Sequence, residues 1–149
     1  PRWLILEITE TSLMTDAANA VPQLETLRDL GIRLAIDDFG TGYSSLSYLR
    51  RFPVDAIKID RSFIAGMSSS REAEALVHTL VNLGKILKLR TVAEGIEDAA
   101  QLTMLKAEGC DSGQGFMFAG PLPPGEVERF FCTSSLQRAT SWGVTSEDA

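Results

Sequence analysis

Short apolar runs alternate with longer amphipathic segments along most of the 149-residue chain. Each apolar run leads into a polar or charged residue, a loop and then a segment with helical periodicity. This alternation is typical of parallel strands joined by helices. We expect strands near residues 3–7, 33–38, 56–58 and 89–94, and a weaker one within 110–118.

The amphipathic segments carry recognisable helix ends. Gly31 fits the left-handed position that follows the last turn of a helix. Ser69 with Glu72 fits a capping box at the start of one later helix, and Asp98 and Gln101 can cap the next. The core-facing stripe expected for the first of these two helices consists of Leu76, Leu80, Leu83 and Leu87.

Parallel strands joined by helices form either an open doubly wound sheet or a closed (β/α)8 barrel. Here charged residues end successive strands, and such residues converge on one point only if the strands form a ring. This favours an α/β fold of the TIM-type barrel class, with the site at the carboxyl ends of the strands. A whole barrel takes about 250 residues, so we expect only its last four to five βα units here.

Composition sets the outer limits of this interpretation. Residues 1–132 are expected to form the barrel portion, and 133–149, rich in Ser and Thr, a polar and flexible C-terminal tail. The net charge of −6 argues against binding a nucleic acid polymer. No apolar run reaches the roughly 18–20 residues that cross a bilayer, so we expect no membrane contact by this segment and a cytoplasmic location.

Four carboxylates stand at the expected strand ends: Glu7, Asp37, Asp38 and Glu94. Oxygen ligands of this kind suit hard divalent cations such as Mg²⁺ or Mn²⁺. Adjacent residues of a strand point to opposite faces, so Asp37 and Asp38 reach one site only if the chain bends at the strand end. The alternative is that these acids are solvated or pair with loop cations.

Lys58 follows a short strand and is expected to lie among these carboxylates. An ammonium in that place can orient an attacking water or stabilise charge on a phosphoryl oxygen. The alternative is a salt bridge that only holds the rim together, with Asp60 as a candidate partner.

Two further features narrow the chemistry. The segment 39–45 has two glycines and several hydroxyls before a helix, which fits a lid or a phosphate cradle, although neither common phosphate-loop motif is present. His78 is the only histidine and falls on an expected helix, away from every strand end. This excludes a histidine-based triad at the rim and a histidine-rich zinc site.

Five motifs, in this order and spacing, make the chain resemble the EAL-domain family of cyclic-di-GMP phosphodiesterases from residue 1 to about 132. They are Glu7-Ile8-Thr9-Glu10, Asp37 to Tyr43 (DDFGTGY), Lys58-Ile59-Asp60, Ala93 to Glu97 (AEGIE) and Gln114-Gly115-Phe116. The Glu-Ala-Leu motif that names the family is not found at a strand end. The same letters at Glu74-Ala75-Leu76 fall in an expected helix, and we interpret them as coincidence.

The resemblance implies hydrolysis of cyclic di-GMP to pGpG with two Mg²⁺ or Mn²⁺ ions. Its implied metal ligands are Glu7, Asp37, Asp38 and Glu94, and its implied catalytic residues are Lys58 and Glu94. Gln114, Glu97 and Asp60 are the candidates for positioning substrate or water, and Glu10 and Thr41 for anchoring the 39–45 loop.

The resemblance also implies partners. These are cyclic di-GMP, a second copy of the chain bound through the 39–45 region, and sensory or cyclase domains upstream. A catalytically inactive cyclic-di-GMP receptor or interaction domain is the alternative function. The isolated 149 residues are expected to show little or no activity, because a metal-binding glutamate and asparagine of the family are not among them.

Overall fold

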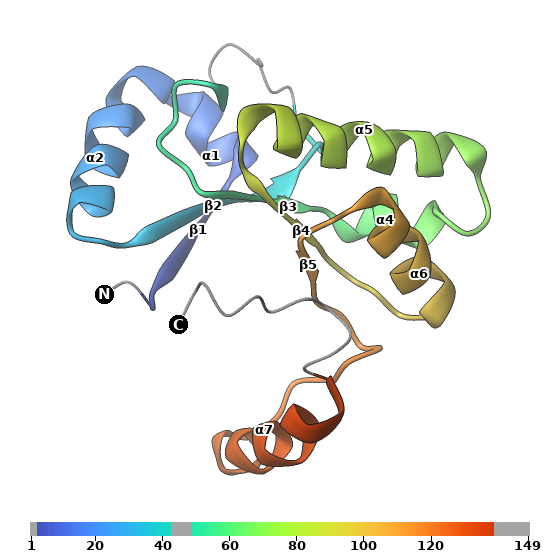
Figure 1. Cartoon of the computed structure of the whole chain (residues 1–149). Coiled ribbons are helices and arrows are strands. Elements are labelled where there is room, and N and C mark those ends of the chain that lie inside the picture. Colours follow the sequence, from blue (N-terminus) through green and yellow to red (C-terminus); the bar gives the residue numbers. More distant parts are fainter. Residues whose placement is uncertain (1–2, 43–48, 139–149) are drawn as a thin grey trace. The chain divides into compact units, whose positions relative to one another are not determined.

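The computed structural model describes residues 3–42 and 49–138 (Figure 1). The chain forms two compact units, 1–117 and 118–149. The first contains β1 (Ile5–Thr9), α1 (Glu10–Thr15), α2 (Ala17–Asp29), β2 (Arg33–Phe39), β3 (Ala56–Ile59), α4 (Arg61–Gly66), α5 (Arg71–Leu87), β4 (Arg90–Ala93), α6 (Ala99–Glu108) and β5 (Ser112–Gly113). The second contains α7 (Pro124–Arg138), a helix that runs past the boundary expected at residue 132.

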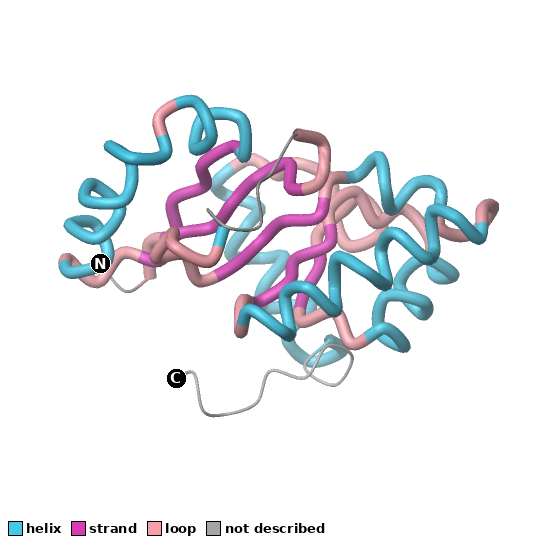
Figure 2. The backbone as a smooth tube through the Cα atoms, turned by 90° about the horizontal axis from the view of Figure 1, so that it is seen from above, coloured by secondary structure: helices cyan, strands magenta, loops and turns pink. Residues whose placement is uncertain are grey.

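The described strands form one parallel sheet in chain order, β1-β2-β3-β4-β5. Figure 2 shows these strands side by side, with helices along the sheet. A doubly wound sheet reverses its strand order at a switch point, whereas a barrel adds each new strand to the same side of the previous one. The sequential order is therefore that of a barrel wall.

One face of the sheet is covered by helices. Leu34 and Ile36 of β2 and Ile57 of β3 are at most 1% exposed. They belong to one apolar core cluster with Leu13 of α1 and Leu24 of α2. Burial of each such side chain stabilises the fold by about 1.5–3 kcal/mol. The apolar side chains therefore determine which side of each strand faces the helices and which side faces away from them.

Two helix starts can be compared with their predictions. The cap predicted at Asp98 and Gln101 is confirmed and forms a capping box of α6, because the Asp98 carboxylate accepts from Gln101 N at 2.8 Å and Gln101 Oε1 accepts from Asp98 N at 3.3 Å. The box predicted at Ser69 is wrong by one residue. Ser70 is the N-cap of α5, while the Ser69 hydroxyl donates to Gly66 O at 3.2 Å.

The buried stripe of α5 also differs from its prediction. Its fully buried positions are Val77, Val81 and Gly84. Of the predicted leucines, Leu80, Leu83 and Leu87 are partly buried and pack against the core cluster, whereas Leu76 is 51% exposed. The reason is the close approach of α5 to β4 at Gly84, where an added Cβ would lie 2.3 Å from Thr91 Cγ2. A count of leucines does not register a glycine as a buried position, so the prediction is right for three leucines of the core-facing side and misses the most buried positions of that side.

Among the residues that the structure describes, no helix is both long enough and apolar enough to span a bilayer.

Candidate metal centre

The face of the sheet opposite the helices gathers the charged side chains. The alternation that buries Ile36 and Ile57 among the helices turns the next side chain of each strand to the other face. The parallel register extends this alternation to the neighbouring strands. The functional side chains that meet on this face are Glu7, Asp37, Lys58, Glu94 and Gln114.

Glu7 reaches this group from within its strand. β1 runs to Thr9, so the prediction that Glu7 ends its strand is wrong. The parallel pairing sets Glu7 beside Ala35, two residues before Asp37. The longer glutamate side chain spans this offset, since its Oε2 lies 2.7 Å from Lys58 Nζ.

The ammonium of Lys58 is the centre of the cluster. Its Nζ lies 2.7 Å from Glu7 Oε2, 2.8 Å from Asp37 Oδ1 and 2.7 Å from Glu94 Oε1, and the lysine side chain is 6% exposed. Burial alone would lower the pKa of Lys58, but hydrogen bonds to Asp37, Glu7 and Glu94 raise this pKa above its usual range. Lys58 is therefore a fixed positive charge at neutral pH.

A β-bulge brings the second aspartate to the same centre. Ile36 pairs with Ile57 and Phe39 with Ile59, so Asp37 and Asp38 oppose a single residue of β3. Asp38 has a left-handed backbone, with φ of 53°. The bend that the sequence analysis required for both aspartates to share a site lies inside β2 at this bulge, and the strand continues to Phe39.

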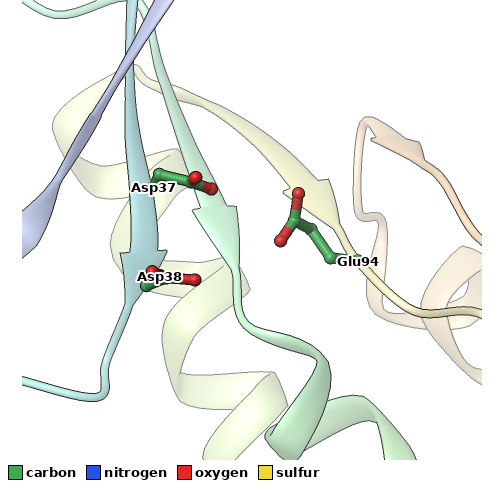
Figure 3. Close-up of side chains that lie close together, drawn as sticks. All are labelled: Asp37, Asp38 and Glu94. Carbon is green, nitrogen blue, oxygen red and sulfur yellow. The ribbon is translucent and has the colours of Figure 1, made fainter.

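The carboxylates of Asp37, Asp38 and Glu94 each place one oxygen within 4.8 Å of the others. Figure 3 shows these three groups turned toward the same space between the strand ends. Together with Glu7, four carboxylates face one ammonium, an excess of three negative charges. An all-oxygen donor set with this excess fits hard divalent cations.

The candidates for positioning substrate or water occupy different places. Gln114 Nε2 donates to Glu94 Oε1 at 3.2 Å, which brings the amide to the metal centre. Glu97 is exposed beyond β4. Asp60 caps α4 by accepting from the Ser62 backbone N at 3.0 Å and from the Ser62 hydroxyl at 2.5 Å. Lys58 forms its ion pairs with Glu7, Asp37 and Glu94, so the salt bridge considered between Lys58 and Asp60 is not formed.

Glu10 and Thr41 both contact the start of the 39–45 loop. The Glu10 carboxylate, 1% exposed, accepts from Gly40 N at 2.8 Å. The Thr41 hydroxyl donates to Asp38 O at 2.8 Å. The remainder of the loop expected to mediate dimerisation, 43–45, lies outside the described residues.

The close packing of Gly115, which supports its neighbour Gln114, was not predicted from the sequence. A Cβ on Gly115 would lie 2.1 Å from Ile96 O and 2.2 Å from Ile96 N. Ile96 N donates to Gln114 O at 3.1 Å and Ile96 O accepts from Met117 N at 3.0 Å. The glycine after Gln114 was a readable signal, because a glycine at that place permits close approach of two backbones.

His78 takes no part in this centre. It lies on α5, where its Nδ1 pairs with the Glu108 carboxylate of α6 and its Nε2 contacts the Asn82 amide at 2.7 Å. The Glu-Ala-Leu letters at 74–76 also lie within α5, between β3 and β4 and at the end of neither strand.

The sheet and its acidic centre define an α/β barrel wall with a candidate cation site at the carboxyl rim. The family model of the EAL domain matches residues 1–121, and the chain belongs to this family.

Known relatives give the same result. NbdA, a cyclic di-GMP phosphodiesterase of Pseudomonas aeruginosa, is 46% identical over 128 residues, which are 86% of this chain and 16% of NbdA. The structure of the P. aeruginosa MucR phosphodiesterase in complex with cyclic di-GMP has a TM-score of 0.82 at 46% identity, and the match covers 85% of this chain and 51% of that chain. Klebsiella pneumoniae BlrP1 with manganese and cyclic di-GMP matches with a TM-score of 0.75 at 38% identity, over 81% of this chain and 31% of that chain.

These matches confirm the predicted family and the TIM-type barrel class, of which the described strands form one part. The chain spans about half of the matched MucR structure and about a sixth of NbdA.

Proposed function

We propose that the protein carrying this chain is a metal-dependent cyclic-di-GMP phosphodiesterase that hydrolyses cyclic di-GMP to pGpG. The observation that carries this proposal is the buried Lys58 ammonium, held at 2.7–2.8 Å from three carboxylates and beside the Asp37–Asp38 bulge. Membership of the EAL family and the activity named for NbdA support the substrate.

Four carboxylates of the chain are assigned to hold two Mg²⁺ or Mn²⁺ ions: Glu7, Asp37, Asp38 and Glu94. The excess negative charge and the donor atoms support this assignment. When bound, such a pair of ions supplies a nucleophilic water at neutral pH and neutralises charge on the phosphoryl group.

Lys58 and Gln114 act around these carboxylates. Asp37 and Glu94 anchor the ammonium, and the N–H that pairs with Glu7 can be directed at the attacking water or at a phosphoryl oxygen when the Glu7 carboxylate holds a cation. The Gln114 amide fixes the Glu94 carboxylate, and its second N–H is available to substrate or water.

Glu97 and Asp60 have separate assignments. Exposed Glu97 is assigned to substrate contact. Asp60 acts on the site through the orientation of α4, in place of a direct contact with Lys58.

We also propose the setting of this activity. The protein is cytoplasmic, dimerises through the 39–45 region anchored by Glu10 and Thr41, and carries sensory or cyclase domains upstream. The small share of NbdA that this chain covers, and the two activities in the name of the P. aeruginosa relative MucR, a bifunctional diguanylate cyclase and phosphodiesterase, support further domains.

The proposal is tested by turnover of cyclic di-GMP to pGpG in Mn²⁺ by the full-length protein, compared with its Lys58→Ala and Lys88→Ala variants. Lys88 is exposed at the C-cap of α5, so its variant controls for loss of a lysine charge. We expect turnover to fall by at least about 100-fold in Lys58→Ala and to persist in Lys88→Ala. Turnover that survives Lys58→Ala refutes the role of Lys58, and binding of cyclic di-GMP without any turnover assigns the receptor function instead. The isolated 149 residues are expected to show little or no turnover.

A further inference from the structure

Segment 94–98 connects the metal centre to helix α6, and its backbone is fixed on the side of β5. Ile96, which is 0% exposed, donates its N–H to Gln114 O at 3.1 Å and accepts from Met117 N at 3.0 Å. The position of the Glu94 carboxylate thus depends on a segment that is held by its neighbours and not by side-chain packing at Glu94 alone.

The other side of this segment is held by a buried amide, Gln101 of α6. This residue is 4% exposed. Its Oε1 accepts from Glu97 N at 2.8 Å and from Asp98 N at 3.3 Å. A capping box requires only the bond to the N-cap residue, here Asp98. The shorter bond, to Glu97, reaches one residue further toward Glu94 and has no part in capping the helix.

The remaining polar atom of Gln101 reaches a different βα unit. Its Nε2 donates to Ile64 O in α4 at 3.4 Å, and both residues are buried. Helix α4 begins directly after β3, the strand of Lys58. Figure 1 labels α4 and α6 next to each other, in agreement with this contact.

A close backbone approach reinforces the same junction. A Cβ on Gly95 would lie 2.5 Å from Cβ of Arg61, the first residue of α4. Glu94 N also donates to Ile59 O at 3.1 Å. Contacts therefore close a ring from Lys58 through α4, Gln101 and segment 94–98 back to Glu94, whose carboxylate pairs with Lys58.

We infer that Gln101 is a positioning residue of the metal centre, which sets Glu94 relative to Lys58 by bonding segment 94–98 and α4 at once. This inference rests on the proposed function, because it assigns Glu94 to cation binding. Gln101 touches neither substrate nor cation and acts only through the backbone of these two segments.

The test compares Mn²⁺ affinity of the wild-type protein with that of Gln101→Met and Asp98→Ala, measured well below the melting temperature of each. Gln101→Met keeps the side-chain volume and removes all three side-chain bonds. Asp98→Ala removes the N-cap of α6 but leaves the bonds of Gln101 to Glu97 and Ile64. We expect Mn²⁺ affinity to fall by about tenfold in Gln101→Met, as for groups that orient metal ligands, and to stay within about twofold in Asp98→Ala.

The two variants separate positioning from stability, because both weaken the start of α6. Equal Mn²⁺ affinities of the folded Gln101→Met and Asp98→Ala variants overturn the inference. If Gln101→Met does not fold, Gln101→Glu decides the question, since it keeps an acceptor for Glu97 N and replaces the donor to Ile64 O by a carboxylate oxygen. Weaker Mn²⁺ binding by folded Gln101→Glu supports the inference, and wild-type affinity overturns it. Absence of Mn²⁺ binding by the wild type refutes instead the proposed function.

Discussion

The left-handed backbone of Asp38 links the chemistry of this chain to a local conformation. Residues with a Cβ avoid this region at a cost of roughly 1 kcal/mol, although aspartate tolerates it better than most. Thr41 offsets part of that cost, since its N and its hydroxyl both donate to Asp38 O, at 3.3 and 2.8 Å. The conformation that aims the Asp38 carboxylate is thus maintained by the four-residue turn 38–41.

Replacement of Asp38 separates its backbone from its carboxylate. Asp38→Gly and Asp38→Ala both lose the carboxylate, but only glycine adopts a positive φ without strain. We expect the glycine variant to be more stable than the alanine variant by about 1 kcal/mol in urea unfolding, with Mn²⁺ binding weakened equally in both. An alanine variant as stable as the glycine variant would show that φ at this position relaxes without the aspartate.

At the scale of single elements, helix α4 depends on Asp60 for its start. The Ser62 hydroxyl and backbone N–H bond the Asp60 carboxylate and hold its pKa below the usual range. We expect Asp60→Ala to lower the free energy of unfolding by about 1 kcal/mol at pH 7.

The pH dependence of this loss follows from the direction of the pKa shift. A carboxyl group whose pKa is lower in the folded than in the unfolded protein stabilises the fold fully above its unfolded pKa of about 4. This stabilisation is lost as the pH falls through the pKa of the folded state. The difference between wild type and Asp60→Ala, measured by urea unfolding, should therefore shrink below about pH 4. Asp60→Asn is the control, because its neutral cap should keep a pH-independent advantage over Asp60→Ala.

The loop after β4 depends in the same way on Gly115. A side chain at this position would strike backbone atoms of Ile96, and these cannot rotate away. We expect Gly115→Ala to lower the free energy of unfolding by about 2 kcal/mol or more and to displace Gln114 from Glu94. Gly125→Ala, where an added Cβ meets nothing within 4 Å, is the matched control and should be nearly neutral. Similar effects of both substitutions on stability would contradict the close packing at Ile96.

At the scale of the whole molecule, cation binding and folding should be coupled. In the absence of cations, Asp37, Asp38 and Glu94 repel one another within 4.8 Å. An ion that binds only the folded state stabilises it by about 2.7 kcal/mol at 100 times its Kd. We expect Mn²⁺ to raise the melting temperature, EDTA to reverse the rise, and Asp38→Asn to remove most of it. A melting temperature that does not change on addition of Mn²⁺ would argue against a cation site at these carboxylates.

Much of this arrangement could be predicted from the sequence, because residues at the same place in successive parallel strands lie next to one another in the sheet. Asp37, Lys58 and Glu94 lie at corresponding places in successive βα units, and the register brings them together. The cap formed by Asp98 and Gln101 is encoded by local spacing and was equally predictable.

Features that depend on contacts between elements could not be predicted in this way. The bulge in β2 is a shift of register against β3, and no local pattern in the aspartate pair marks it. The burial of Gly84 on α5 depends on how closely this residue approaches Thr91 of a later strand. Sequence periodicity measures neighbours along the chain, whereas both features are set by residues that are distant in sequence.

The bulge at Asp37 and Asp38 also places two carboxylates on one side of the sheet whose Cα atoms are separated by a single peptide bond. Consecutive Cα atoms across a trans peptide are about 3.8 Å apart, and two-metal sites keep their ions about 3.5–4 Å apart. In a regular strand two consecutive residues cannot exploit this agreement of lengths, because their side chains point to opposite faces of the sheet. With one extra residue in β2, the two aspartates reach one side of the sheet from Cα atoms that are a single peptide unit apart, a length close to the spacing of the two ions that we propose they hold.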